Sequence, residues 1–247
     1  MIGIILQARM GSTRLPGKVL KEVNGQPLLS YQLARISKCK RIDKIVVATS
    51  LNPIDDAIVD ICEKINIPCF RGDENDVLSR YYECAKKYKL STIVRLTGDC
   101  PLIDPSIVDK IVMKFKTDNV DYCSNTIPPQ TSSYPDGTDV EIFSMHALSK
   151  SHQECQDKTF REHVTFYMWK TSKFLTSQME HKENISNYRL TVDYKEDLDV
   201  INLIDNYLRQ NNEFGSLESI IKFLKNNKKV RDMNSKYKVG DGWKLDE

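Results

Sequence analysis

The sequence lacks the cysteine motifs, the long apolar runs and the strong net charge that mark several classes of protein. Its seven cysteines are an odd number and form no C-x-x-C pair, so neither a zinc ribbon nor a disulfide framework is indicated, and Cys100 is assigned no role. No apolar run approaches the roughly 20 residues that cross a bilayer. The net charge is only +2, which argues against a general nucleic-acid-binding surface.

What is present is the composition of a globular protein long enough for one well-filled domain. No secretory leader is visible ahead of the first apolar segment, so a cytoplasmic protein is expected. Strand and helix patterns alternate through the first half, which predicts an α/β fold with a mixed, mainly parallel sheet between helices. The expected strands are 2–6, 45–48, 67–70 and 92–96, and the expected helices are 28–36, 53–64, 76–88 and one from Pro105.

The second half is less regular. Strands are predicted over 122–124, 138–143, 174–179 and 188–192, and helices over 161–169, 194–209 and 216–225. No linker is evident, so residues 1–247 are treated as a single domain. The lysine-rich stretch 222–238 is interpreted as a solvated helix end, because few aromatic residues interrupt it as they would in a membrane or nucleic-acid patch.

The most informative string follows the first apolar segment directly and reads QARMGSTRLPGK, residues 7–18. Glycines let a backbone approach an anion closely, while backbone N–H groups and the side chains of Arg9, Arg14 and Lys18 share its charge. The string indicates a phosphate-binding loop, although a solvated basic turn would have the same composition. It matches neither the G-x-x-x-x-G-K-[ST] loop nor the G-x-G-x-x-G loop.

Two aspartates each follow a predicted strand. Asp99 lies in the string TGDCP, and Asp193 lies in the string TVDYKEDL. Ligands bind at the carboxyl ends of strands in an open α/β sheet, where a carboxylate suits Mg²⁺. A plain turn is the alternative for Asp99. Capping of the next helix, completed by Glu196, is an alternative or an added role for Asp193.

These strings together resemble the cytidylyltransferases that activate 3-deoxy-manno-octulosonate and acylneuraminates, and the first looks most like the spore-coat polysaccharide, SpsF-type branch. Tyr194 stands where threonine is usual in the octulosonate enzymes. The resemblance implies a nucleotide-diphospho-sugar-transferase-like fold, Mg²⁺ bound by Asp99 and Asp193, and catalysis by these carboxylates with Arg9 and Lys18. It also implies nucleotide contacts from Gln7, Ala8, Arg9, Gly11, Ser12, Arg14, Lys18, Thr97 and Gly98.

Further clusters resemble the spore-coat branch and depart from the octulosonate pattern, so the identity of the acceptor is not predicted. Asp76 and Arg80 are candidates for base and ribose contacts, with helix capping and a surface arginine as alternatives. Asp139 and Glu141 would share one face of a strand. The residues expected to form the acceptor pocket are Asp136, Asp139, Glu141, Arg161, Glu162 and His163, although Asp136-Gly137 is also a turn sequence.

The leading hypothesis is nucleotidyl transfer, in which CTP and a sugar or sugar-like acid give a CMP-conjugate and pyrophosphate for surface polysaccharide synthesis. The alternatives are a glycosyltransferase of the same fold and a non-catalytic nucleotide-binding protein. Such glycosyltransferases usually carry a D-x-D motif, which neither 97–99 nor 136–139 provides, and a binding module would not need both carboxylates. The relatives also suggest a homodimer formed through an extension within about 120–190.

Overall fold

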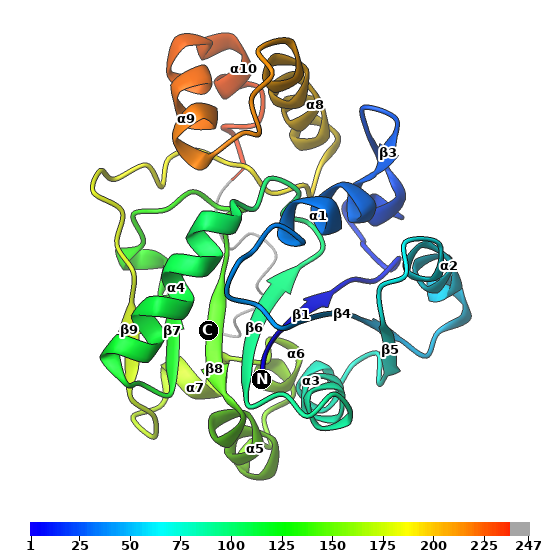
Figure 1. Cartoon of the computed structure of the whole chain (residues 1–247), viewed down its shortest axis with the longest axis vertical. Helices are drawn as coiled ribbons and strands as arrows, with labels where there is room; N and C mark the ends of the chain where they lie inside the picture. Colours follow the sequence, from blue (N-terminus) through cyan, green and yellow to red (C-terminus); the bar gives the residue numbers. More distant parts are fainter. Residues whose placement is uncertain (238–247) are drawn as a thin grey trace.

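The computed structural model describes residues 1–237, which form a mixed seven-stranded sheet with helices on both faces (Figure 1). The strands of this sheet are β1 (Ile2–Gln7), β4 (Lys44–Ser50), β5 (Cys69–Gly72), β6 (Thr92–Thr97), β7 (Tyr122–Ser124), β8 (Glu141–Ser144) and β9 (Thr176–Gln178). Their order is β5-β4-β1-β6-β8-β7-β9, and β8 alone runs against the others. A separate hairpin pairs β2 (Glu22–Val23) with β3 (Gln26–Pro27).

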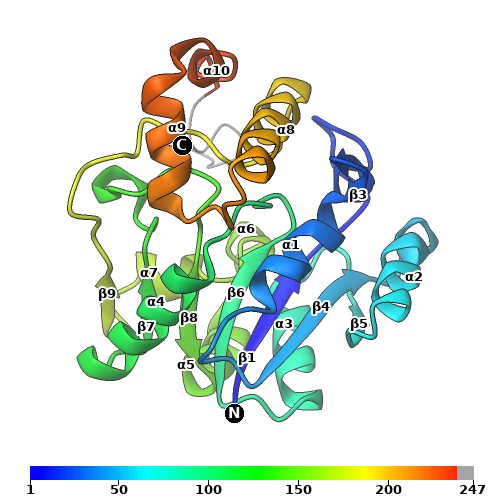
Figure 2. The ribbon, with the colours of Figure 1, turned by 45° about the horizontal axis from the view of Figure 1, so that its top comes forward.

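The helices cover the sheet on two sides. They are α1 (Leu28–Ile36), α2 (Asp56–Lys64), α3 (Val77–Lys87), α4 (Pro105–Asp118), α5 (Met145–Glu154), α6 (Lys158–Glu162), α7 (Phe166–Lys170), α8 (Lys195–Gln210), α9 (Leu217–Asn226) and α10 (Lys228–Asp232), with 3₁₀ turns η1 (Lys18–Leu20), η2 (Pro53–Asp55) and η3 (Pro129–Thr131). Successive side chains of a strand face opposite sides. Ile4 and Leu6 therefore join a core with α1, α2, α4, α8 and α9, whereas Ile5 joins a second core with α3, α5 and α7. Both ribbon views place α8, α9 and α10 together at one end of the molecule (Figure 1 and Figure 2).

The predicted α/β fold with a mainly parallel sheet is confirmed. Helix α1 has the predicted bounds, and α3 follows Asp76, whose carboxylate caps it by accepting the N–H of Ser79 at 2.9 Å. Among residues 1–237, none of the helices combines the length and apolarity needed to cross a bilayer.

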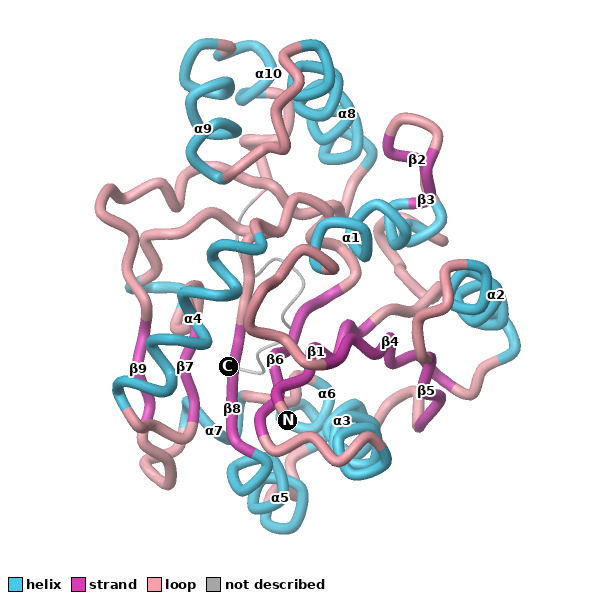
Figure 3. Tube along the Cα trace, in the orientation of Figure 1, coloured by secondary structure: helices cyan, strands magenta, loops and turns pink. Residues whose placement is uncertain are grey.

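The second half departs from prediction in four places. Strand β8 begins at Glu141 rather than at residue 138, and β9 is shorter than 174–179. The helix predicted over 161–169 is instead α6 and α7, because Val164 between them has a left-handed φ of 63°. The strand predicted over 188–192 is wrong, since Arg189 makes only an isolated bridge with Asp136. Figure 3 shows the long irregular segment that connects β9 to α8 and includes these residues.

Candidate functional site

Residues of the strings QARMGSTRLPGK (7–18) and TGDCP (97–101) line one cleft of about 370 Å³. Strands β1 and β6 are parallel, hydrogen-bonded neighbours, so the loops that follow them lie side by side at the same edge of the sheet. The cleft is lined by Gln7, Ala8, Arg9, Ser12, Thr13, Arg14, Lys18, Val19, Thr97, Gly98 and Asp99. The residues proposed to bind nucleotide therefore come together, apart from Gly11, Asp76 and Arg80.

The two loops approach each other closely at Gly98. Its N–H donates to the carbonyl oxygen of Gln7 at 2.7 Å. A Cβ at this position would lie 3.1 Å from that oxygen and 3.2 Å from the Cβ of Ala8. The amide of Gln32, which the sequence analysis did not single out, donates to the carbonyl of Thr97 at 2.8 Å and supports the second loop.

The loop at residues 7–18, which is proposed to bind phosphate, is anchored by Asp55. The carboxylate of Asp55 accepts the N–H of Met10 at 2.7 Å and both the N–H and the hydroxyl of Ser50. Burial opposes the charged form of Asp55, but these hydrogen bonds outweigh it and lower the pKa of the group. The sequence around Asp55 contains no motif that marks it as functional. Its one signal is position, because it follows the carboxyl end of β4, which neighbours β1.

The two candidate metal-binding carboxylates meet at Lys18. The Nζ of Lys18 lies 2.8 Å from Oδ2 of Asp99 and 2.8 Å from Oδ1 of Asp193. Arg14 approaches the same oxygen of Asp193 at 2.8 Å. The backbone brings the two aspartates together, since the N–H of Val192 donates to the carbonyl of Asp99 at 2.8 Å.

The charges of this cluster stabilise one another. Burial alone would lower the pKa of Lys18, but Asp99 and Asp193 outweigh it and raise that pKa. Burial alone would raise the pKa of Asp99, but the Lys18 ammonium holds it well below its usual range. Lys18 and Asp99 are therefore charged over the whole neutral range.

Asp193 does not cap α8, contrary to the capping alternative. Asp197 has that role: its Oδ2 accepts the N–H of Asp193 at 2.9 Å and the N–H of Tyr194 at 3.0 Å. Glu196 does not complete a capping box, as that alternative required, because the acidic residue of the box is Asp197. The carboxylate of Asp193 is thereby left to the cationic side chains of Arg14, Lys18 and Arg189.

The donor set fits a magnesium ion shared with a nucleotide. Asp99 and Asp193 supply hard oxygens from two separate loops, and the Lys18 ammonium between them shows that both carboxylates can face one cation. Within residues 1–237, no group of three or more His, Cys, Asp or Glu side chains is arranged to hold a metal. Mg²⁺ needs only one or two protein carboxylates when phosphate oxygens and water complete its coordination.

Asp136 and Asp139 lie beside this cluster. Asp136 pairs with Nη1 of Arg189 at 2.7 Å. Asp139 accepts the N–H of Gly137 at 2.7 Å and the thiol of Cys100 at 3.9 Å. Burial raises the pKa of both carboxyls, and that of Asp136 rises well above its usual value. These two proposed acceptor residues thus border the carboxylate pair.

Glu141 is placed differently from Asp139. It is 3% exposed, and its Oε1 accepts the hydroxyls of Tyr122 at 2.6 Å and Thr165 at 2.5 Å, while Oε2 pairs with Arg95. Arg95 stands directly opposite on β6, in register with Glu141. Arg95 could not be recognised from its neighbours in the sequence, because its partner comes from a strand 46 positions further along the chain.

The remaining acceptor candidates gather around α6. Arg161 pairs with Asp76 at 2.7 Å, which joins two residues that the sequence analysis assigned to different parts of the site. His163 is half-buried and stacks on Phe166 with 4.4 Å between ring centroids. Burial, aided by the charge of Arg95, lowers the pKa of His163, so this imidazole is neutral at pH 7. Glu162 is exposed.

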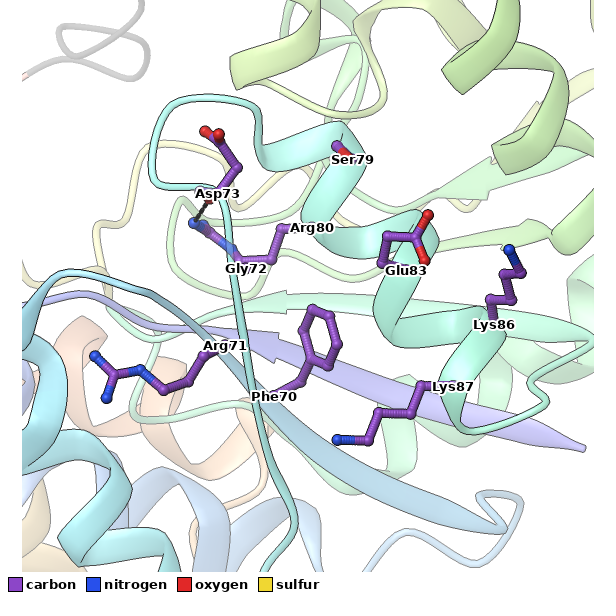
Figure 4. Close-up of a pocket in the computed structure, with 9 residues that line it drawn as sticks. All are labelled: Phe70, Arg71, Gly72, Asp73, Ser79, Arg80, Glu83, Lys86 and Lys87. Atoms are coloured by element: carbon purple, nitrogen blue, oxygen red, sulfur yellow. Dashed lines mark hydrogen bonds between the residues drawn. The ribbon is translucent and has the colours of Figure 1, made fainter.

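Arg80 is not the surface arginine that one alternative predicted. It is 1% exposed, and its Nη1 donates to the carbonyl of Asp73 at 2.6 Å. Figure 4 shows this side chain reaching from α3 toward the Asp73 end of the adjacent segment. Arg80 lines a separate groove of about 510 Å³ between β5 and α3.

Gly137 allows the segment before β8 to pack against the segment that leads to Asp193. Its φ is +92°, and a Cβ there would lie 2.1 Å from the nitrogen of Thr191. We expect Gly137→Ala to lower the melting temperature by at least about 5 °C, because a strained backbone conformation alone costs about 1–3 kcal/mol and displacement of the neighbouring backbone adds to that cost. The matched control is Gly25→Ala, which has a φ of +81° and no atom within 4 Å of the added Cβ. Equal losses for both variants in thermal melts would contradict this account of Gly137.

Comparison with known proteins agrees with this arrangement. A family model described as cytidylyltransferase matches residues 3–236. The chain is 36% identical over 242 residues to an uncharacterized protein of Methanocaldococcus jannaschii, covering 95% of this chain and 94% of that protein. It is 35% identical over 205 residues to the spore coat polysaccharide biosynthesis protein SpsF of Bacillus subtilis, covering 80% and 83% of the two chains.

Among solved structures, a cytidylyltransferase from Leptospira borgpetersenii superposes with a TM-score of 0.85 at 34% identity, covering 93% of this chain and 96% of that one. The expected family and its SpsF-like branch are confirmed by these matches. The strings at 7–18 and 97–99, the cleft that they line and the matched length of the chain lead to one conclusion: the protein belongs to the cytidylyltransferase family.

Proposed function

We propose that the protein transfers the cytidylyl group of CTP to a hydroxyl of a sugar or sugar-like acid, releasing pyrophosphate, with Mg²⁺ as the metal. The main support for this proposal is that Asp99 and Asp193 both contact Lys18, the last residue of the phosphate-binding loop. A cleft with paired carboxylates and several cations suits a metal-bound triphosphate. The product would serve surface polysaccharide synthesis.

In this proposal Asp99 and Asp193 hold the metal and Arg9, Arg14 and Lys18 hold the triphosphate. When bound, Mg²⁺ neutralises phosphate charge and helps pyrophosphate to leave. The basic side chains stabilise the charge that develops on the leaving oxygens, because a fixed cation in a cleft needs no rearrangement as the bond breaks. The backbone of the loop contributes N–H groups whose approach is allowed by its glycines.

The acceptor is proposed to bind near Asp136 and Asp139, which border the carboxylate pair. The role of Glu141 in this proposal is to fix the wall of the site, since its carboxylate oxygens are already hydrogen-bonded to Tyr122, Thr165 and Arg95. Arg161, Glu162 and His163 would shape the far side of the acceptor pocket. Asp76 and Arg80 would shape the base and ribose side of the nucleotide site, Arg80 through the carbonyl of Asp73 that it holds. A homodimer through residues 120–190 and a cytoplasmic location belong to the same proposal, and sedimentation would test the dimer.

The nucleotide preference can be tested without knowing the acceptor. We expect CTP with Mg²⁺ to raise the melting temperature by about 5–10 °C at a concentration 100 times its Kd, because a ligand that binds the folded state stabilises it by mass action. ATP, GTP and UTP should give smaller shifts. Equal shifts with all four nucleotides would contradict the cytidine preference and leave only general nucleotide binding.

A turnover assay distinguishes the proposed cytidylyl transfer from glycosyl transfer and from nucleotide binding without catalysis. Pyrophosphate release from CTP, measured with a panel of sugar acids and sugar alcohols, should depend on the acceptor. A glycosyltransferase would instead release a nucleoside phosphate from a nucleotide sugar. A binding protein would release neither, and that result would overturn the proposal.

A further inference from the structure

The lysine-rich stretch near residue 230 is more than a solvated helix end. Helix α10 and the residues after it form an arm, residues 228–237, that returns toward the segment carrying Asp193. Lys236 on this arm is 62% exposed in its ion pair with Glu196, as the composition predicts. Asn234, two residues earlier, is only 3% exposed. A buried amide needs polar partners, so its contacts indicate what the arm does.

Asn234 donates to a buried carboxylate. Its Nδ2 lies 2.9 Å from Oδ1 of Asp197 and 3.2 Å from the carbonyl oxygen of Arg189. Asp197 is fully buried. It also accepts Nε of Arg189 at 2.8 Å, together with the N–H groups of Asp193 and Tyr194. Asn234 is therefore one of the donors that fix this carboxylate and, through it, the turn before α8.

The same network sets the orientation of Asp193. Nη2 of Arg189 lies 3.1 Å from Oδ2 of Asp193 and 3.1 Å from Oδ2 of Asp197. With Oδ2 of Asp193 held by Arg189, Oδ1 faces Lys18 and Arg14. The position of the Arg189 guanidinium depends on Asp197, and the position of Asp197 depends in part on Asn234.

A second contact of the arm connects it to the phosphate-binding loop indirectly, through Tyr194. Tyr237 stacks on Tyr194 with 3.7 Å between ring centroids and an interplanar angle of 6°. The guanidinium of Arg14 lies 5.6 Å from the centroid of the Tyr194 ring. The arm thus supports both Asp193 and one of the cations that faces it.

We infer that the arm, residues 228–237, is part of the active site, and that Asn234 is a positioning residue that keeps Asp193 aimed at the metal through Asp197 and Arg189. This inference rests on the proposed function, since it assigns Asp193 to the metal. Groups that orient a metal ligand typically change metal affinity by about 10–100-fold when removed. The loss of Asn234 should therefore appear in metal affinity before it appears in the fold.

The test compares Asn234 on the arm with Asn227, the residue that immediately precedes the arm. Asn234→Ala removes the donor to Asp197, whereas Asn227→Ala, the matched control, removes an amide that donates to the carbonyl of Phe223 in α9. The measurement is the dissociation constant of Mn²⁺ from the enzyme with saturating CTP and no acceptor, followed by water-proton relaxation. We expect about a 10-fold rise for Asn234→Ala and no significant change for Asn227→Ala. Excess Mn²⁺ should restore the pyrophosphate release of Asn234→Ala, which it would not do for a variant that is merely less stable.

Asp193→Asn distinguishes failure of this inference from failure of the proposed function. If Asp193→Asn weakens Mn²⁺ binding while Asn234→Ala does not, the arm is only structural and the inference is overturned. If Asp193→Asn itself binds Mn²⁺ normally, the proposed metal site is wrong and the inference is overturned with it. Weakened binding in both variants, with the control unchanged, supports the inference.

Discussion

Replacing Asp99 by asparagine is expected to slow pyrophosphate release from CTP by at least about 100-fold, the effect typical of removing a key electrostatic group. The amide keeps the shape of the side chain but removes its charge and is a poor ligand for Mg²⁺. Lys18 would also retain only one of its two carboxylate partners. The rate should be measured at saturating CTP with the best acceptor found for the unmodified protein.

A matched control is Asp109→Asn. Asp109 lies on α4, does not line the cleft, and accepts the N–H groups of Lys40 and Arg41. Thermal melts of both variants would show whether any loss of rate reflects unfolding. A near-normal rate for Asp99→Asn would place the metal elsewhere and limit Asp99 to supporting the turn after β6.

The part of the site that the sequence predicts best is local. The strings at 7–18 and 97–99 each begin at the last residue of a strand, and because β1 and β6 are adjacent, the two strings line one cleft. The prediction of Asp193 rests on the resemblance and on a strand at 188–192 that does not form. Its approach to Asp99 depends on a hydrogen bond between Val192 and Asp99 that joins two irregular segments.

Alternating apolar residues misled the prediction at 188–192. Tyr188, Leu190 and Val192 alternate with polar residues, as in a strand with one face on the core, but in the structure Arg189 and Thr191 between them are buried as well. Their backbone partners are not those of a strand, however. The N–H of Leu190 donates to the carbonyl of Asp136, and that of Val192 donates to the carbonyl of Asp99. An alternating apolar pattern in the sequence therefore does not distinguish a strand from a segment whose hydrogen bonds go to loops.

Pairs of charged residues far apart in the chain could not be predicted either. The partner of Glu141 is set by the register between β6 and β8, and the partner of Asp76 is set by the packing of α6 near the start of α3. Each of these carboxylates is consistent with ligand binding when only its neighbours in sequence are considered. In the folded protein Glu141 pairs with Arg95 and Asp76 pairs with Arg161. Their proposed role is therefore to hold neighbouring groups of the site in position.

Replacing Lys18 by alanine is expected to have two opposite effects. CTP affinity should fall by about 10-fold or more, because a hydrogen bond from a charged donor contributes about 1.5–3 kcal/mol, and pyrophosphate should leave more slowly with every acceptor. Mn²⁺ affinity without nucleotide should rise, because the ammonium that lies 2.8 Å from Asp99 and from Asp193 would no longer compete for them. Calorimetry with CTP and water-proton relaxation with Mn²⁺ measure the two effects separately.

Two further variants make this expectation specific. Lys21→Ala removes an exposed lysine three positions along the chain and should change neither affinity. Asp139→Ala removes a carboxylate proposed to bind the acceptor, so CTP affinity should stay close to normal while the KM for the acceptor rises, or kcat falls if its contact forms only in the transition state. If Asp139→Ala loses CTP affinity as severely as Lys18→Ala, residues 136–141 belong to the nucleotide site and the acceptor binds elsewhere. If Lys18→Ala binds Mn²⁺ no better than the unmodified protein, the two carboxylates that surround Lys18 are not the metal site.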